Sequence, residues 1–150
     1  MHKEVNIKNK KARHEFEFLE VLTAGLVLKG TEIKSVKESR ARIAESFCQF
    51  KEGELYVINM NIDEYSHGNI YNHVPTRERK LLLNKKELKK LQTKVRDNGL
   101  TIVPIKLFVN QSGLAKLNIA LAKGKKLHDK RQDLKLKDAK RSMDRAKKSF

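Results

Sequence analysis

TIVPIKLFVNQSGLAKLNIAL, residues 101–121, has the pattern of a β-hairpin. The residues predicted to share one face of the first strand are Thr101, Val103, Ile105, Leu107 and Val109. Asn-Gln-Ser-Gly, residues 110–113, supplies the turn. The returning strand is predicted to carry its apolar face on Ala115, Leu117, Ile119 and Leu121. Pro104 has no N–H to donate to a ladder, so it predicts a strand edge or a bulge.

Further strands are predicted upstream of this hairpin. Residues 15–22 are rich in Phe, Leu and Val, and their alternation slips near Leu19, which predicts a bulge. Residues 24–28 are expected to continue this strand around Gly25. Strands at 43–50 and 55–62, joined by a turn at 51–54, predict a second hairpin. One face of its returning strand is expected to hold Tyr56, Ile58, Met60 and Ile62.

Two helices are predicted between the strands. Gly30 and Thr31 supply a turn and an N-cap for a short helix. A longer helix over residues 85–97 begins at the N-cap Asn84, with Glu87 placed for a capping box, and ends before Gly99. Its buried stripe is Leu88, Leu91 and Val95, and its solvent side is basic. That basic side is compatible with a solvated surface and equally with an RNA contact.

The order of these elements predicts the fold class. Five or six strands with regular turns favour a small closed β-barrel over an open parallel sheet, and closure removes exposed strand edges. Residues 63–76 lack a periodic pattern and are predicted to form a loop. The chain is therefore expected to be mainly β, with peripheral helices.

Positive charge dominates the composition. The 150 residues include 34 Lys or Arg and 18 Asp or Glu, which gives a net charge of +16. Half of this charge lies in the last 28 residues, where 12 Lys or Arg stand against 4 Asp. We therefore expect a flexible basic N-terminus (1–11), a barrel (12–124) and a basic C-terminal tail (125–150). Nucleic acid is the expected partner of such a chain.

A membrane partner is not expected. The chain has no Trp, no secretory signal at its N-terminus and no apolar run near the roughly 20 residues that span a bilayer. These features predict a cytoplasmic protein.

Enzymatic motifs are not found in the sequence. It contains no P-loop, no Gly-x-Ser-x-Gly and no Cys-x-x-Cys. Cys48 is predicted to be a small core residue. His67 and His73, with Asp63 or Glu64, match no common zinc spacing. We therefore expect no catalytic residue, no metal and no cofactor.

The tail carries a helical stripe among its charges. Apolar residues recur there every three or four positions: Leu136, Ala139, Met143, Ala146 and Phe150. An isolated helix so rich in charge is marginal in water. The pattern predicts a tail that is disordered when free and helical when docked on RNA, with permanent disorder as the alternative.

Four segments resemble the small protein B family of tmRNA-binding proteins. They are NKKARHEF (9–16), LKGTEIKS (28–35), PTRERKLLLN (75–84) and ALAKGKK (120–126) followed by HDKR (128–131). The resemblance implies an OB-fold-like barrel that binds the tRNA-like domain of tmRNA. It also implies that the protein escorts alanyl-tmRNA to ribosomes stalled on non-stop mRNA, in trans-translation, without catalysis. The implied partners are tmRNA and the small-subunit rRNA near the decoding centre and mRNA channel.

The resemblance and the basic clusters together predict two groups of RNA-binding residues. The group expected to contact tmRNA is Lys10, Lys11, Arg13, His14, Gly25, Glu32, Lys34, Arg77, Arg79, Lys80, Leu82 and Asn84. The group expected near the decoding region is Lys125, Lys126, His128, Asp129, Lys130, Arg131, Lys135 and Met143.

Two departures from the family pattern stand out. Thr23 occupies a position where the family usually has Glu, and the far tail lacks the family's usual Trp. The alternative function is that of a ribosomal protein or initiation-factor-like barrel that binds rRNA.

Overall fold

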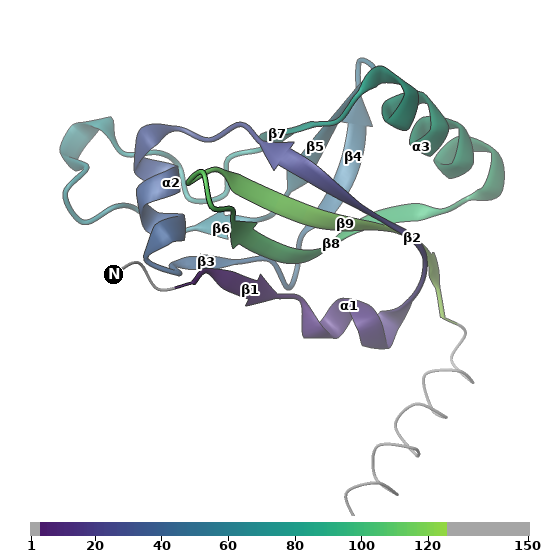
Figure 1. Cartoon of the computed structure of the whole chain (residues 1–150), viewed down its shortest axis with the longest axis horizontal. Coiled ribbons are helices and arrows are strands. Elements are labelled where there is room, and N and C mark those ends of the chain that lie inside the picture. Colours follow the sequence, from purple (N-terminus) through teal and green to yellow (C-terminus); the bar gives the residue numbers. More distant parts are fainter. Residues whose placement is uncertain (1–3, 126–150) are drawn as a thin grey trace, which may run out of the picture.

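The computed structural model describes residues 4–125. Its strands form a closed barrel with three helices packed outside it (Figure 1). In chain order the elements are β1 (Asn6–Lys8), α1 (Lys10–Glu15), β2 (Phe16–Leu26), α2 (Gly30–Lys37), β3 (Ala41–Arg42), β4 (Phe47–Lys51), β5 (Glu54–Ile58), β6 (Asn61–Ile62), the 3-10 helix η1 (Asn69–Tyr71), β7 (Arg79–Leu82), α3 (Lys85–Asn98), β8 (Thr101–Val109) and β9 (Ala115–Gly124).

Six antiparallel strands close the barrel. From β8 the order runs through β4, β5, β7, β2 and β9, and β9 pairs with β8 again. The joint between β4 and β8 is short, with Cys48 opposite Ile102. β3 and β6 form a separate two-stranded sheet. This architecture confirms the predicted mainly β class and the OB-fold-like closed barrel of about six strands.

The start of the chain is part of the barrel. β1 pairs with β8, with Ile7 opposite Leu107, and Val5 is buried. Residues 5–8 therefore differ from the flexible N-terminus expected over 1–11. A three-residue strand has too short a pattern to be predicted, because its stability comes from the partner strand.

Two bulges turn apolar residues toward two different cores. The predicted bulge in β2 is present, since the register shifts between Phe18 and Glu20. A second shift, between Pro104 and Lys106, breaks the single face expected for residues 101–109. Val103 and Ile105 consequently pack in a small outer core under α1, together with Ala12, Phe16, Phe18, Ala120 and Ala122.

The second hairpin differs from its expected pattern. In β5 the buried residues are Leu55 and Val57, rather than Tyr56 and Ile58. Asn59 has a left-handed backbone (φ 63°), which ends the strand and resets the alternation before Met60. The expected partner strand at 43–50 begins only at Phe47, because Ser46 closes a turn onto the Ile43 carbonyl.

The helices begin and end as local chemistry dictates. The capping box of α3 is confirmed: Asn84 Oδ1 accepts from the Glu87 N–H at 2.8 Å, and the helix stops at Gly99 with φ 63°. α2 begins two residues earlier than predicted, with Lys29 in place of Thr31 as N-cap. Thr31 hydrogen-bonds His73 instead of capping the helix.

Candidate nucleic-acid interface

α1 presents four of the predicted RNA-binding residues at one end of the barrel (Figure 1). Asn9 is buried and fixes this helix, because its Oδ1 accepts from the Ala12 N–H and its Nδ2 donates to the Pro104 carbonyl at 2.9 Å. The four residues that follow Asn9 outside the core are Lys10, Lys11, Arg13 and His14.

The basic side chains of α1 differ in their partners. Lys11 is hydrogen-bonded to Glu45 at 2.8 Å, and this bond raises its pKa. Within residues 4–125, Lys10 and Arg13 form no ion pair. Because the Lys125 N–H donates to the Glu15 carbonyl, the tail leaves the barrel beside this helix. We call α1 and this exit point the tail-exit end.

A buried ion-pair network holds three further predicted residues. Glu32 on α2 and Arg79 on β7 have no exposed surface, and their side chains meet at 2.5 Å. Arg77 contacts the other carboxylate oxygen of Glu32 at 2.6 Å. Arg79 also donates to the carbonyls of Met60 and Pro75. The network therefore ties α2, β7 and the ends of the 63–76 loop together.

The charges of this network support one another. Burial opposes ionisation of Glu32, but hydrogen bonds from Arg77, the Lys29 N–H and Arg79 outweigh it and hold the pKa of Glu32 below its usual value. Burial lowers the pKa of Arg79, and Glu32 partly offsets that effect. In this conformation Glu32 and Arg79 cannot touch RNA, unlike the exposed contacts expected from the sequence.

The outer surface of β2 and its neighbours brings together residues from four strands. Gly25 lies opposite Leu82 on one side and Lys116 on the other. Thr23 lies opposite Asn118, and its hydroxyl donates to Asn118 Oδ1 at 2.8 Å. On β8, Lys106 lies opposite Asn118 and adds its ammonium group to that of Lys116 on this surface. We call this surface the β2–β9 face and define it as Thr23, Gly25, Leu82, Lys106, Lys116 and Asn118.

Gly25 shapes this face by lacking a side chain. A Cβ at Gly25 would lie 3.2 Å from Leu82 Cβ and 3.7 Å from Lys116 Nζ. Leu82 is 52% exposed although it sits in a strand of the barrel. The face thus offers an apolar side chain and two lysines around an open backbone, which suits the shape and phosphates of folded RNA.

The remaining predicted residues of the barrel are scattered around these features. Lys80 neighbours Leu82 on β7 and is 3.6 Å from Glu54. Lys34 projects from α2, with its ammonium 5.4 Å from the Tyr65 ring centroid. Asn84 has its side-chain oxygen engaged in the α3 cap. Lys125 is the last described residue, and the other seven decoding-region residues, Lys126 to Met143, lie outside the described part.

Three residues of the β2–β9 face were missed by the sequence analysis: Lys106, Lys116 and Asn118. Lys116 and Asn118 alternate with the core residues Leu117 and Ile119, so the pattern does mark them as outward-facing. Their position beside Gly25 depends on the pairing of β2 with β9, which strands 90 residues apart do not reveal through sequence spacing.

Cys48 and His73, which were considered for catalysis or metal binding, are both held in the packing of the protein. Burial raises the pKa of the Cys48 thiol, which packs against the core. His73 is buried and bonds Thr31 and the Ile62 carbonyl. Over residues 4–125 no group of three His, Cys, Asp or Glu side chains is placed to hold a metal ion. No helix in that same range is long and apolar enough to cross a membrane.

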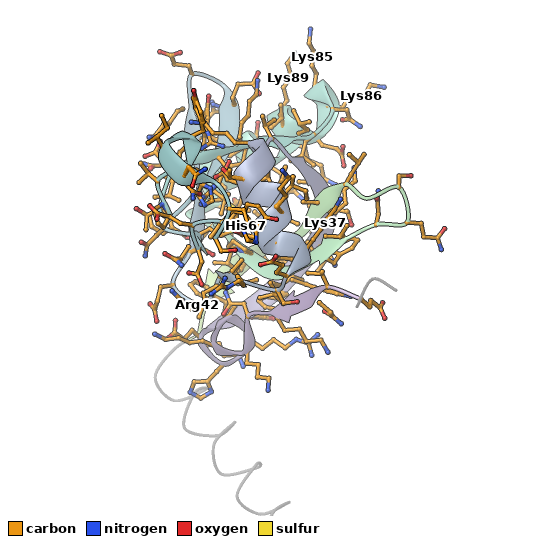
Figure 2. All side chains as sticks on the ribbon, turned by 90° about the vertical axis from the view of Figure 1, so that its left-hand side faces the viewer. Lys37, Arg42, His67, Lys85, Lys86 and Lys89 are labelled. Atoms are coloured by element: carbon orange, nitrogen blue, oxygen red, sulfur yellow. The ribbon has the colours of Figure 1, made fainter. Side chains whose placement is uncertain are left out.

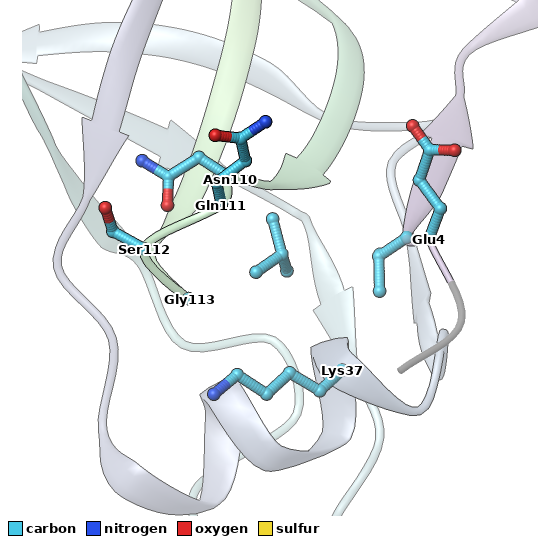
Figure 3. A pocket seen from close by; sticks show the side chains of 8 residues that line it. Glu4, Lys37, Asn110, Gln111, Ser112 and Gly113 are labelled. Atoms are coloured by element: carbon cyan, nitrogen blue, oxygen red, sulfur yellow. The ribbon is translucent and has the colours of Figure 1, made fainter. Parts of the chain in front are cut away.

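A pocket lies between α2, the start of β1 and the β8–β9 turn (Figure 3). Its charged groups are Lys37 and Glu4, and its other polar groups come from consecutive turn residues at 110–113. None of the predicted RNA-binding residues lines it, so the candidate interface consists of the tail-exit end and the β2–β9 face.

Comparison with known sequences gives extensive matches. The family model described as SmpB protein matches residues 6–149. An SsrA-binding protein of Flavobacterium johnsoniae is 58% identical over 150 residues, covering 100% of this chain and 99% of the relative. An SsrA-binding protein of Christiangramia forsetii is 54% identical, covering 100% and 96%.

A solved structure gives an independent match. It is described as "tmRNA-SmpB: a journey to the center of the bacterial ribosome", and one of its chains superposes on this one with a TM-score of 0.68 and 46% identity. The match covers 82% of this chain and 86% of that chain.

Proposed function

This chain belongs to the SmpB protein family, and from that membership we propose that it binds tmRNA and escorts alanyl-tmRNA to ribosomes stalled on non-stop mRNA. The observation that carries the proposal is the similarity to SsrA-binding proteins over the whole chain. The structural match to the chain from the tmRNA-SmpB ribosome structure supports the same role in trans-translation. An rRNA-binding barrel outside this family is not favoured, since the family match spans 6–149.

We assign tmRNA binding to the barrel. The β2–β9 face and the tail-exit end carry six of the twelve predicted tmRNA contacts. Lys10 and Arg13 on α1, and Lys106 and Lys116 on the face, form no ion pair within residues 4–125. Glu32 and Arg79 contribute by positioning α2 and β7, and β7 presents Leu82 and Lys80. The tRNA-like domain is the expected ligand of these surfaces because its folded shape and phosphates match an apolar patch edged by lysines.

We assign ribosome contact to the tail, from Lys125 onward. The segment 125–131 is dense in basic residues, and the apolar residues from Leu136 to Phe150 recur at a spacing that would place them on one face of a helix on docking. The role of the protein is binding and placement of RNA in the cytoplasm, with no chemical step of its own.

A binding comparison across salt concentrations tests the function. We expect the protein to prefer tmRNA over an unrelated structured RNA of equal length, and to keep that preference as salt rises. Nonspecific binding through phosphates should weaken steeply with salt for both RNAs. Equal affinity for the two RNAs at every salt concentration would contradict the proposal.

The β2–β9 face can be tested in the same assay. Leu82→Ala removes a half-exposed side chain, so we expect roughly tenfold weaker tmRNA binding with an unchanged unfolding midpoint. Leu114→Ala is the matched control, because Leu114 is 58% exposed and lies at the β8–β9 turn, outside this face. Equal losses for the two variants would remove Leu82 from the interface.

A further inference from the structure

The loop between β6 and β7 exposes apolar side chains. Ile70 is 88% exposed, Tyr71 83% and Val74 65%, and these are the three most exposed large hydrophobic residues of the described chain. None of the three belongs to either core. In Figure 1 the loop projects past α2, on the side of the molecule away from α3. Apolar residues gathered on one exposed segment indicate a site for a partner.

Hydrogen bonds hold this loop in one shape. The Asn72 side chain spans it, since its Oδ1 accepts from the Tyr65 N–H at 2.9 Å and its Nδ2 donates to the Tyr65 carbonyl at 2.7 Å. Gly68 leaves room for this contact, because a Cβ there would lie 2.5 Å from Asn72 Nδ2. His73 fastens the base of the loop to Thr31 on α2. The exposed residues are therefore presented on a pre-ordered support, which lowers the entropic cost of binding.

The charge of this region differs from that of the rest of the chain. Residues 52–76 contain four acidic residues and no Lys or Arg, although Lys and Arg make up 34 of the 150 residues. Glu64 is exposed and forms no ion pair within residues 4–125. RNA binding depends on cations that neutralise phosphates, so a loop without cations is suited to a protein partner instead.

Two cations of neighbouring elements are engaged by the loop itself. Lys34 on α2 lies over the Tyr65 ring, and Arg42 on β3 pairs with Asp63 at 3.4 Å. Figure 2 faces this side of the molecule and shows His67 of the loop well apart from the exposed lysines at 85, 86 and 89. The loop is thus an apolar and weakly acidic region on a strongly basic protein.

We propose that the loop tip, defined as Ile70 and Tyr71, inserts into an apolar pocket of a basic protein of the ribosome. The proposal rests on the proposed function, because that function brings the chain to the ribosome. Tyr buries a large area at low entropic cost and is enriched among the residues that dominate protein–protein affinity. A Lys or Arg at the rim of the pocket would meet Glu64 with complementary charge. A second copy of this chain is disfavoured as the partner, since each copy carries a net charge of +16.

Photocrosslinking on the full chain tests the identity of the partner. Tyr71 is replaced by the photoreactive residue p-benzoylphenylalanine, and the protein is bound with tmRNA to purified ribosomes stalled on an mRNA without a stop codon. We expect a ribonuclease-resistant crosslink to a basic ribosomal protein, identified by mass spectrometry. The same replacement at Leu114, which is exposed at the β8–β9 turn, is the control and should not give this product. Crosslinks to RNA, to a second copy or to the tail of the same chain would overturn the proposal, as would a yield no higher than that of the control.

The apolar contact is tested by Ile70→Ser with Tyr71→Ser. Affinity for stalled ribosomes should fall roughly tenfold, while affinity for tmRNA alone and the unfolding midpoint stay unchanged, because neither side chain packs in a core. Leu114→Ser is the matched control. Equal ribosome affinities for the double variant and this control would remove the tip from the interface.

Charge reversal distinguishes a basic protein from RNA by the sign of the effect. Glu64→Lys should weaken ribosome binding roughly threefold against a basic protein, whereas an RNA partner would be bound more tightly. Glu52→Lys makes the same change in net charge at the exposed β4–β5 turn and should lack the loss. Tighter binding by Glu64→Lys than by Glu52→Lys would contradict the proposal.

Failure of this proposal is distinguishable from failure of the proposed function. If the wild type neither preferred tmRNA nor bound stalled ribosomes, the proposed function would be lost, and the ribosomal partner of the loop with it. If the wild type did both while the loop variants matched their controls, the loop proposal alone would be lost.

Discussion

Glu32→Gln is expected to lower the free energy of unfolding by about 3 to 5 kcal/mol, because it leaves the guanidinium of Arg79 buried without a counter-charge. Glutamine keeps the size of the side chain but presents an NH₂ group to two arginine donors. Arg79 is fully buried, so it cannot turn to water for compensation. Urea denaturation followed by circular dichroism measures the change.

Two further variants isolate the cause. Glu78→Gln breaks the exposed pair with Lys51, and it should cost at most about 1 kcal/mol. Replacing both buried partners, Glu32→Leu with Arg79→Met, should recover part of the loss, because no unpaired charge remains inside. If Glu32→Gln were as stable as Glu78→Gln, the network would not hold the barrel together.

The pH dependence of stability is a second test of the same ion-pair network. The ionised carboxylate of Glu32 is favoured in the folded state, so its stabilisation is complete above the unfolded pKa of 4.5 and is lost as pH falls through the lower folded pKa. The gap in stability between wild type and Glu32→Gln should stay constant from about pH 8 to 5. It should narrow at lower pH, because the amide of the variant does not titrate.

Local patterns predicted the parts of this fold that depend on neighbours in sequence. The bulge near Leu19, the cap at Asn84 and the stop at Gly99 each follow from a few adjacent residues. The face of β8 was mispredicted because the extra residue at Ile105 inverts the alternation, and Asn59 does the same after β5. Both errors arise where a single residue reverses which side chains of the strand face the core.

The site required long-range information. Glu32 and Arg79 are 47 residues apart, and the sequence analysis placed both among the residues expected to contact tmRNA. Only the packing of α2 against β7 shows that they neutralise each other inside the protein. Lys116 was overlooked for a related reason, because its neighbour Gly25 comes from β2, which is distant in sequence from β9.

Removing the tail is expected to abolish the action of the protein on the ribosome while the barrel still binds tmRNA. A chain that ends at Lys125 keeps all of β9 and the Lys125–Glu15 hydrogen bond that closes it. The buried core of the described chain lies between Val5 and Ala122, so we expect the same unfolding midpoint as for the full chain. Preference for tmRNA over unrelated RNA should persist, whereas tagging of proteins on stalled ribosomes should fall to the level seen without the protein.

The shortened chain should also inhibit. The deletion removes 10 Lys or Arg and 4 Asp, so overall RNA affinity should decrease while the β2–β9 face stays intact. Added in excess to a tagging reaction with full-length protein, it should occupy tmRNA and slow tagging in proportion to its concentration. The Leu82→Ala form of the shortened chain is the control and should inhibit much less. Continued tagging by the shortened chain alone would assign ribosome engagement to the barrel and would contradict the role given to the tail.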